Sequence, residues 1–400
     1  MGLIAQRIVR MSPSETLAMS QKSAKLASEG KNVINLSLGE PDFFTPEFIK
    51  TYAKKAIDEN YTFYPPVPGY MDLREAICKK LKRDNNVDYA PNQIIVSNGA
   101  KHAIMNTILA VIDPGDEVII PAPYWVSYPE MVKIADGVPV EIYSGVENDF
   151  KVTAQQIEAA ITPKTKLIML NSPSNPTGAI YSYDELKAIA DVVASHPNIV
   201  VISDEIYELI NFGQKPECFA QFSAIKDRVV LVNGVAKGWA MTGWRIGYIA
   251  ASVEIASACN KIQGQMTSAC SSIAQRATVA AMLQDPTQSD DLKKMVVTFQ
   301  QRRDLVLSHL AQIPGVKTNK PTGAFYVFAD ISSYFGTSHA GYTIQSGADM
   351  ANYLLDTVYV ALVGGNAFGN KNCIRFSYAT SNEKLTDACN RIKEALSKLQ

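Results

Sequence analysis

The feature that most constrains this 400-residue chain is an alternation of short apolar runs with helix-like segments through its middle. The clearest run is Ile199-Val-Val-Ile202. A run without polar alternation is typical of a strand that is buried on both faces, and strands that alternate with helices favour a parallel sheet. We therefore predict seven strands, over residues 93–97, 117–121, 138–143, 166–170, 199–203, 229–232 and 246–251.

The segments between these strands carry helix signals. Residues 101–112 and 183–194 both have the spacing of an amphipathic helix. The second segment follows Ser182, and Glu185 stands three positions later, which is the capping-box pattern of a helix start. The expected fold class is α/β, with a large domain in which a mainly parallel seven-stranded sheet lies between helices.

The two ends of the chain predict a second, smaller α+β domain. Residues 291–310 have the pattern of a long amphipathic helix with one broad apolar stripe. Short strands and a last helix follow near residues 325–328, 374–378 and 384–399. Because chain termini often lie close together, we expect the N-terminal segment to join this domain. The expected division is an N-terminal arm and part of the small domain over 1–45, the large domain over 46–290 and the small C-terminal domain over 291–400.

Charge and composition exclude several classes of protein. Lys and Arg number 38 against 39 Asp and Glu, so the formal net charge of -1 argues against a nucleic-acid partner. Hydrophobic residues make up 47% of the chain, yet no run approaches the length of a membrane-spanning helix. The six cysteines and four histidines form no C-x-x-C or H-E-x-x-H pattern, so we expect no metal site. The N-terminus lacks the apolar stretch of a secretory signal, which predicts reduced thiols in the cytoplasm.

Four polar motifs follow predicted strands, which is where open α/β folds bind ligands. The first, Ser97-Asn-Gly-Ala-Lys101, opens a helix. Helix N-termini attract phosphate, Gly99 lets the backbone come close, and Lys101 can add charge. The second, Asn171-Ser-Pro-Ser-Asn-Pro-Thr-Gly178, is a rigid loop in which either prolyl bond could be cis. A plain turn without a ligand is the alternative interpretation of each.

The third and fourth motifs carry charged groups. Asp204 ends a buried strand and needs a partner, since an unpaired buried charge is costly. A protonated ring nitrogen of a cofactor would serve, and helix capping is the alternative. Lys237 follows the next strand among small and apolar residues, which favours a lowered amine pKa and a Schiff base, with a solvated surface lysine as the alternative. Arg245, eight residues later, can hold a phosphate with two hydrogen bonds.

Together these motifs resemble those of class I aminotransferases, which are pyridoxal-phosphate enzymes of fold type I. The resemblance rests on N-x-P-x-N-P-T-G at 171–178, S-D-E-I-Y at 203–207 and A-K-x-x-x-M-T-G-W-R-I-G-Y at 236–248. It extends from residue 11 to residue 380. The block D-P-G-D-E-V-I-I, at residues 113–120, is most similar to bacterial aspartate aminotransferases of subgroup Ib.

The resemblance implies roles for the residues around the cofactor ring. Lys237 would bind pyridoxal 5'-phosphate as a Schiff base and then move the proton of the substrate Cα. Asp204 would pair with the ring nitrogen. Tyr207 and Asn175 would donate to the phenolic oxygen of the ring, and Trp125 would stack on its face.

The phosphate and the substrate would have their own residues. The phosphate would lie on the backbone of Gly99 and Ala100, near Lys101, with Arg245 beside it. Tyr64 would reach the phosphate of the neighbouring subunit, so the resemblance implies a homodimer with shared active sites.

The substrate α-carboxylate would bind Arg375, a planar guanidinium that matches a carboxylate, helped by Asn175, Trp125 and the backbone of Gly39. Lys101 is a candidate for the side-chain carboxylate of the substrate. One departure is Ala236, where many relatives have a serine whose hydroxyl would contact the phosphate.

The activity that this resemblance implies is a ping-pong transfer of the amino group of L-aspartate to 2-oxoglutarate. Four alternatives stay open within the same fold. Prephenate would be a second acceptor, or the donor would be alanine or an aromatic amino acid, or the enzyme would be a C–S β-lyase that eliminates instead of transferring.

Overall fold

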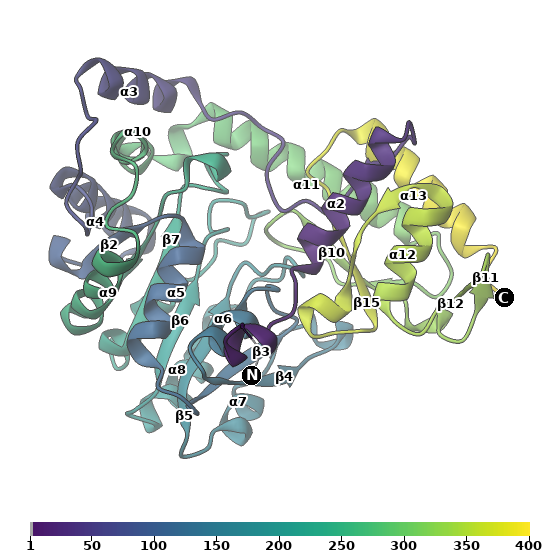
Figure 1. Cartoon of the computed structure of the whole chain (residues 1–400), viewed down its shortest axis with the longest axis horizontal. Helices are drawn as coiled ribbons and strands as arrows, with labels where there is room; N and C mark the ends of the chain where they lie inside the picture. Colours follow the sequence, from purple (N-terminus) through teal and green to yellow (C-terminus); the bar gives the residue numbers. More distant parts are fainter. Residues whose placement is uncertain (1–2) are drawn as a thin grey trace.

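A seven-stranded sheet lies at the centre of the chain (Figure 1). The structure is a computed structural model that describes residues 3–400, so residues 1 and 2 of the predicted N-terminal arm lie outside the described residues. The strand order is β2-β8-β7-β6-β5-β3-β4. The strands are β2 (Ile94–Ser97), β3 (Glu117–Ala122), β4 (Val138–Tyr143), β5 (Thr165–Asn171), β6 (Val200–Asp204), β7 (Val229–Gly234) and β8 (Gly247–Ala250). Each begins and ends within two residues of a predicted strand, which confirms the α/β prediction.

The strand β8 runs against its neighbours. It is antiparallel to both β2 and β7, whereas the other paired strands of this sheet are parallel. Gly247, the first residue of β8, pairs with Ser97 at the end of β2 and with Gly234 at the end of β7. The residue that precedes β8 in the chain therefore lies at the edge where β2, β5, β6 and β7 end.

Helices cover both faces of this sheet. One face packs against α5 (Ala100–Val111), α6 (Tyr128–Ile134) and α9 (Val253–Met266). The other packs against α4 (Met71–Asn85), α7 (Ala154–Ala160), α8 (Tyr183–Ser195) and α10 (Ser272–Leu283), with α3 (Glu47–Asp58) on α10. The side chain of Ser182 accepts from the Glu185 N–H at the start of α8, and Glu185 accepts from the Ser182 N–H, as the capping box predicts. Burial of an aliphatic side chain contributes about 1.5–3 kcal/mol, so the continuously apolar strands require cover on both faces.

The second domain is built on a smaller antiparallel sheet. Its strand order is β14-β15-β10-β9, formed by β14 (Val363–Gly364), β15 (Cys373–Ser377), β10 (Tyr326–Asp330) and β9 (Lys317–Thr318). Around it lie α11 (Asp290–Leu310), α12 (Gly347–Val358) and α13 (Asn382–Leu396), beside a short hairpin of β11 (Ser338–His339) and β12 (Tyr342–Thr343). The long helix, the two strands and the terminal helix that the sequence predicts here are all present.

The N-terminal segment packs against this second domain. The short strand β1 (Ile34–Asn35) pairs in parallel with β13 (Val360–Ala361). The helix α2 (Glu15–Ser28) packs against β13 and β14, and α1 (Gln6–Val9) reaches back to α6 of the large domain (Figure 1). The segment that carries α2 and β1 thus packs on the C-terminal part of the chain, while the division of the chain at residues 45 and 290 stays a prediction. In the part of the chain that the structure describes, no helix is both long and apolar enough to cross a bilayer.

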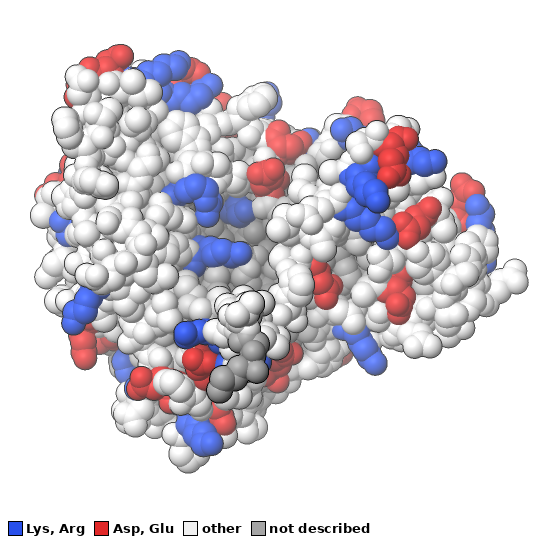
Figure 2. Space-filling view, viewed as in Figure 1, with Lys and Arg blue, Asp and Glu red and all other residues white. Residues whose placement is uncertain are grey.

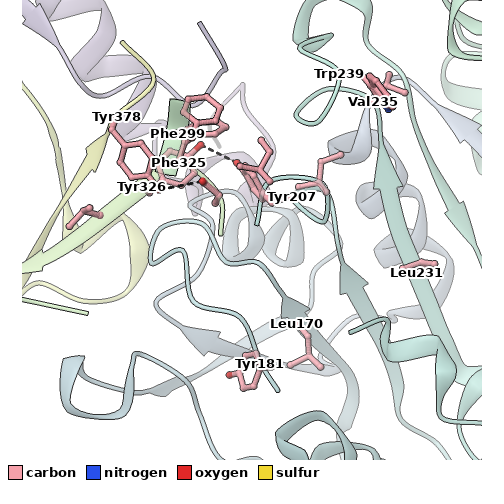
Figure 3. Close-up of a cluster of buried hydrophobic side chains, with 14 of the residues drawn as sticks. Leu170, Tyr181, Tyr207, Leu231, Val235, Trp239, Phe299, Phe325, Tyr326 and Tyr378 are labelled. Carbon is pink, nitrogen blue, oxygen red and sulfur yellow. Dashed lines mark hydrogen bonds between the residues drawn. The ribbon is translucent and has the colours of Figure 1, made fainter. Parts of the chain in front are cut away.

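Aromatic side chains fill the contact between the two domains (Figure 3). Phe299 of α11 stacks on Phe325, with ring centroids 5.2 Å apart, and contacts Tyr378 edge-on. Phe325 and Tyr326 in turn meet the ring of Tyr207, which follows β6 in the large domain. This aromatic cluster packs the small sheet against the edge where the large strands end.

Candidate active site

A cavity of about 440 Å³ lies between the two domains, at the edge where the predicted motifs end. A volume of this size suits a small-molecule ligand. Figure 2 shows Lys and Arg side chains gathered in the hollow between the domains. The predicted residues that line the cavity are Gly39, Ala100, Lys101, Trp125, Asn175, Asp204, Tyr207, Lys237, Arg245 and Arg375. Gly99 directly precedes Ala100, whereas Tyr64 is 95% exposed and stands apart from the cavity.

The start of α5 forms a cradle with Arg245. Gly99 has φ +83°, a left-handed conformation that favours glycine, and a Cβ there would collide with the Arg245 guanidinium. A Cβ on Gly247 would collide with the backbone N of Ala100, so this second glycine, which the sequence did not single out, is needed too. Arg245 donates from Nη2 to the Asn98 carbonyl at 3.3 Å. Helix N–H groups and a guanidinium that meet at one point fit a phosphate.

Asp204 is a buried carboxylate that lines the cavity. Its carboxylate is 4% exposed and accepts from the Tyr128 hydroxyl at 2.8 Å and from the Ile206 N–H at 3.2 Å. Burial raises the pKa of Asp204 to about 6, and the hydrogen bond from Tyr128 opposes the rise. Sequence reasoning gave Tyr128 no role, although a buried phenol regularly needs a polar partner. A buried carboxylate in this position suits a protonated ring nitrogen.

Lys237 lines the same cavity as the start of α5. Its Nζ donates to the Gly39 carbonyl at 2.5 Å and lies 5.8 Å from the centre of the Tyr207 ring. Burial lowers the pKa of the Lys237 amine to about 8, while the charge of Glu40 acts in the opposite direction. An amine that is partly neutral near physiological pH can attack a carbonyl and can also carry a proton.

Arg375 is 2% exposed and uses only part of its donor capacity. It donates from Nη1 to Oδ1 of Asn175 at 3.0 Å and from Nη2 to the Ser37 carbonyl at 2.6 Å. Its Nε is buried and has no acceptor among residues 3–400. A guanidinium has five N–H donors, so three remain for a ligand. This arrangement fits a carboxylate that enters from the cavity.

The loop that carries Asn175 is fixed from within. The Asn175 N–H donates to Oδ1 of Asn171 at 2.8 Å, and Ser172-Pro173 and Asn175-Pro176 are both cis. Two other lining residues lie together, with the Lys101 ammonium 5.0 Å from the centre of the Trp125 ring. The indole ring of Trp125 therefore lines the cavity beside a positive charge.

Several lining residues were not foreseen. Tyr326 shares a 3.0 Å hydrogen bond with Tyr207 through their hydroxyl groups. Ser14 and Thr16 line the cavity from the start of α2, and Ser14 caps that helix by accepting from the Leu17 N–H. The N-cap pattern marks Ser14 in the sequence, but nothing local shows that this helix start lies over the cavity. Among the described residues no group of three or more His, Cys, Asp or Glu side chains is placed to hold a metal ion.

Comparison with known proteins agrees with this site. A family model described as aminotransferase class I and II matches residues 31–392. A Petunia hybrida protein named bifunctional aspartate aminotransferase and glutamate/aspartate-prephenate aminotransferase is 47% identical over 98% of this chain and 82% of its own length. An aspartate/prephenate aminotransferase of Cereibacter sphaeroides is 46% identical over 98% of both chains.

Solved structures show the same fold. The aspartate aminotransferase of Rhizobium meliloti superimposes with a TM-score of 0.96 over the whole of both chains, at 41% identity. The Thermus thermophilus aspartate aminotransferase with maleate gives a TM-score of 0.92 over 99% of this chain and 100% of that chain, at 37% identity. From these matches, and from the lysine, aspartate and arginine that meet in its cavity, the chain belongs to the class I and II aminotransferase family.

Proposed function

We propose that this aminotransferase moves the amino group of L-aspartate to 2-oxoglutarate in a ping-pong cycle, with pyridoxal 5'-phosphate bound to Lys237. One observation carries the proposal. The Lys237 amine shares a single cavity with two cationic anchors, Arg375 and Lys101. A dicarboxylic amino acid has two carboxylates to match them, whereas alanine and tyrosine have one.

The residues present fit pyridoxal phosphate. The glycine cradle at Gly99 and Arg245 suits its phosphate, and the Asp204 carboxylate suits its ring nitrogen. Tyr207 and Asn175 line the cavity where its phenolic oxygen would lie. When bound, the cofactor supplies an electrophilic carbonyl and a ring that accepts electrons.

Lys237 performs the proton transfer. Its Nζ removes the proton from the substrate Cα and later returns it, and a pKa of about 8 suits both directions near neutral pH. The Gly39 carbonyl orients the amine. Asp204 keeps the ring nitrogen protonated, because an ionised buried carboxylate favours the charged form of its partner.

The substrate is held at both ends. Arg375 binds the α-carboxylate through its free N–H donors, with Asn175 fixing the plane of the guanidinium. Lys101 binds the side-chain carboxylate. Thr16 supports this assignment, since its Oγ1 is buried and has no partner in the described part of the chain. An incoming carboxylate gives this hydroxyl an acceptor.

Steady-state rates with aspartate, alanine and tyrosine as donors test the proposal. We expect the highest kcat/KM for aspartate, and a fall of about 10–100-fold for aspartate but not for alanine in Lys101→Gln, since the ion pair between Lys101 and the side-chain carboxylate is lost. A preference of the wild type for alanine or tyrosine would contradict the substrate. A near-normal rate in Lys237→Ala would contradict the mechanism. Pyruvate and sulfide release from cystathionine without an oxo acid would indicate a C–S β-lyase.

Prephenate is the second candidate acceptor. It is supported by the names of the Petunia and Cereibacter relatives, both of which include prephenate. Amino transfer from aspartate to prephenate, followed by product chromatography, tests it. A rate no higher than that without enzyme rejects prephenate and leaves the aspartate reaction untouched.

A homodimer is part of the proposal. Tyr64 and its neighbour Phe63 are 95% and 80% exposed, which is unusual for two adjacent aromatic side chains. In a dimer, Tyr64 would reach the phosphate cradle of the partner subunit. Light scattering after gel filtration tests the assembly, and a monomer that is fully active would contradict it. A cytoplasmic location remains a prediction, supported by the six cysteines, all of which are free.

A further inference from the structure

Tyr326 links two parts of the site that come from different domains. It begins β10 in the small sheet, and its side chain is fully buried at the cavity wall. Its neighbour strand β15 carries Arg375, which pairs in register with Phe328. Because side chains alternate along a strand, Tyr326 and Phe328 share one face of the sheet with Arg375.

The ring of Tyr326 supports the guanidinium. The Cζ atom of Arg375 lies 4.6 Å from the centre of the Tyr326 ring and 4.9 Å from the centre of the Phe368 ring. These rings hold the guanidinium plane without using any of its N–H donors. The donors therefore stay available for a carboxylate.

The hydroxyl of Tyr326 meets Tyr207. The two oxygens are 3.0 Å apart, and both groups are shielded from solvent (Figure 3). Each hydroxyl has one proton to donate. When Tyr207 donates into the cavity, its oxygen can only accept from Tyr326, so the order of donation becomes Tyr326 to Tyr207 to ligand. Burial raises the pKa of both phenols, Arg375 opposes the rise in both, and the pKa of Tyr207 is raised further, which agrees with Tyr326 as the donor.

We propose that Tyr326 is a positioning residue with two separable parts: its hydroxyl orients and polarises Tyr207 toward the cofactor, and its ring fixes Arg375 for the substrate carboxylate. This inference rests on the proposed use of pyridoxal phosphate. Its consequence is that loss of the hydroxyl alone changes the protonation of the bound cofactor, while loss of the ring also weakens carboxylate binding.

The test uses the holoenzyme and two readouts that do not depend on turnover. The first is the pH titration of the visible absorbance of the bound cofactor, and the second is the dissociation constant of maleate, an unreactive dicarboxylate. In Tyr326→Phe we expect the apparent pKa of the absorbance change to rise by about 0.5–1, the size of one neutral hydrogen bond, with maleate binding within about twofold of wild type. In Tyr326→Leu we expect maleate binding to weaken at least about threefold as well.

Tyr378→Phe is the matched control. Tyr378 belongs to the same buried aromatic cluster, but its hydroxyl donates to the Ala324 carbonyl at 3.3 Å and not to a cavity residue. We expect it to leave both readouts at their wild-type values. Equal pKa changes in Tyr378→Phe and Tyr326→Phe would overturn the proposal, because they would show a general packing effect.

The double variant Tyr207→Phe/Tyr326→Phe tests whether Tyr326 acts through Tyr207. If Tyr326 acts through Tyr207, adding Tyr326→Phe to Tyr207→Phe changes the apparent pKa no further. A full additional change in that background would overturn the proposed order of donation. A failure of the proposed function would be distinguishable. If the wild-type protein gained no visible absorbance with pyridoxal phosphate, the proposed cofactor would be wrong, whatever the role of Tyr326.

Discussion

Arg302 of α11 and Asp42 form a two-pronged ion pair, with Nη1–Oδ1 and Nη2–Oδ2 distances of 2.7 and 2.9 Å. The pair anchors the segment that follows β1. In this segment the Ser37 carbonyl accepts a hydrogen bond from Arg375 and the Gly39 carbonyl accepts one from Lys237, and both cations line the cavity. A side chain outside the cavity therefore sets the position of two backbone acceptors within it.

Replacing Arg302 by lysine is expected to weaken substrate binding. A lysine cannot make two parallel bonds to Asp42, so the Ser37 and Gly39 carbonyls shift. We expect maleate to bind about 5–20-fold more weakly, which corresponds to about 1–2 kcal/mol. The control is Arg391→Lys, since Arg391 makes a similar two-pronged pair on the surface helix α13. Equal affinities in the two variants would show that the Arg302 pair does not position the segment.

The Lys237 amine is expected to destabilise the ligand-free protein at neutral pH. The pKa of this amine is about 8 in the folded chain and 10.5 when unperturbed, so folding disfavours the protonated amine. The free energy of unfolding therefore decreases as the pH falls from 10.5 through 8, and the full loss is present below pH 8. Lys237→Met should raise the free energy of unfolding by about 2 kcal/mol at pH 6, after allowing for the lost bond to Gly39. The gain should vanish between pH 8 and 10.5. Urea unfolding at several pH values measures it, and a gain that is independent of pH would contradict the lowered pKa.

Tyr128 is expected to keep Asp204 ionised. Burial raises the pKa of the Asp204 carboxyl to about 6, and the hydrogen bond from Tyr128 limits this rise. In Tyr128→Phe this pKa should rise further, so that the loss of pyridoxal-phosphate affinity on acidification occurs about 0.5–1 pH unit higher. Tyr124→Phe is a suitable comparison, because the Tyr124 hydroxyl donates to Glu141 instead. The same acid midpoint in all three proteins would refute this role.

The glycine before α5 is expected to matter for the cofactor more than for stability. Gly99 and Gly115 both have positive φ, of +83° and +90°, so alanine at either should cost about 1 kcal/mol of stability. Only at Gly99 does the added Cβ meet the Arg245 guanidinium. Gly99→Ala should therefore reduce pyridoxal-phosphate affinity about tenfold or more, with Gly115→Ala unchanged. Equal cofactor affinities would show that the cradle tolerates a side chain.

The sequence predicted the large domain well because its strands carry their own signal. A run such as Val229–Gly234 is buried at nearly every position, and burial on both faces leaves an apolar run that is readable without knowing its neighbours. The order of the strands within the sheet could not be predicted from the sequence. Nothing in β8 itself shows that it is reversed and inserted between β2 and β7, since the same apolar pattern suits either direction.

The site was predictable where residues follow strand ends and not where they come from elsewhere. Asp204 is the last residue of β6 and Lys237 follows β7, so the rule that ligands bind where strands end found them both. The same rule does not identify Tyr326 or Arg302. Tyr326 has the pattern of an ordinary strand residue. Arg302 lies on the apolar stripe of a helix, where an arginine is normally expected to be exposed, yet it is buried.

The parallel pair of β1 and β13 has a consequence for how the protein is made. A ribosome releases Ile34 long before it releases Val360, so the first strand waits for its partner through almost the whole of translation. The strands of the large sheet lie between β1 and β13 in the chain, so the ribosome has released all of them before it releases Val360. The segment that carries the Gly39 carbonyl is tied to the last third of the chain, and catalytic competence therefore comes at the end of synthesis rather than with the folding of the large sheet.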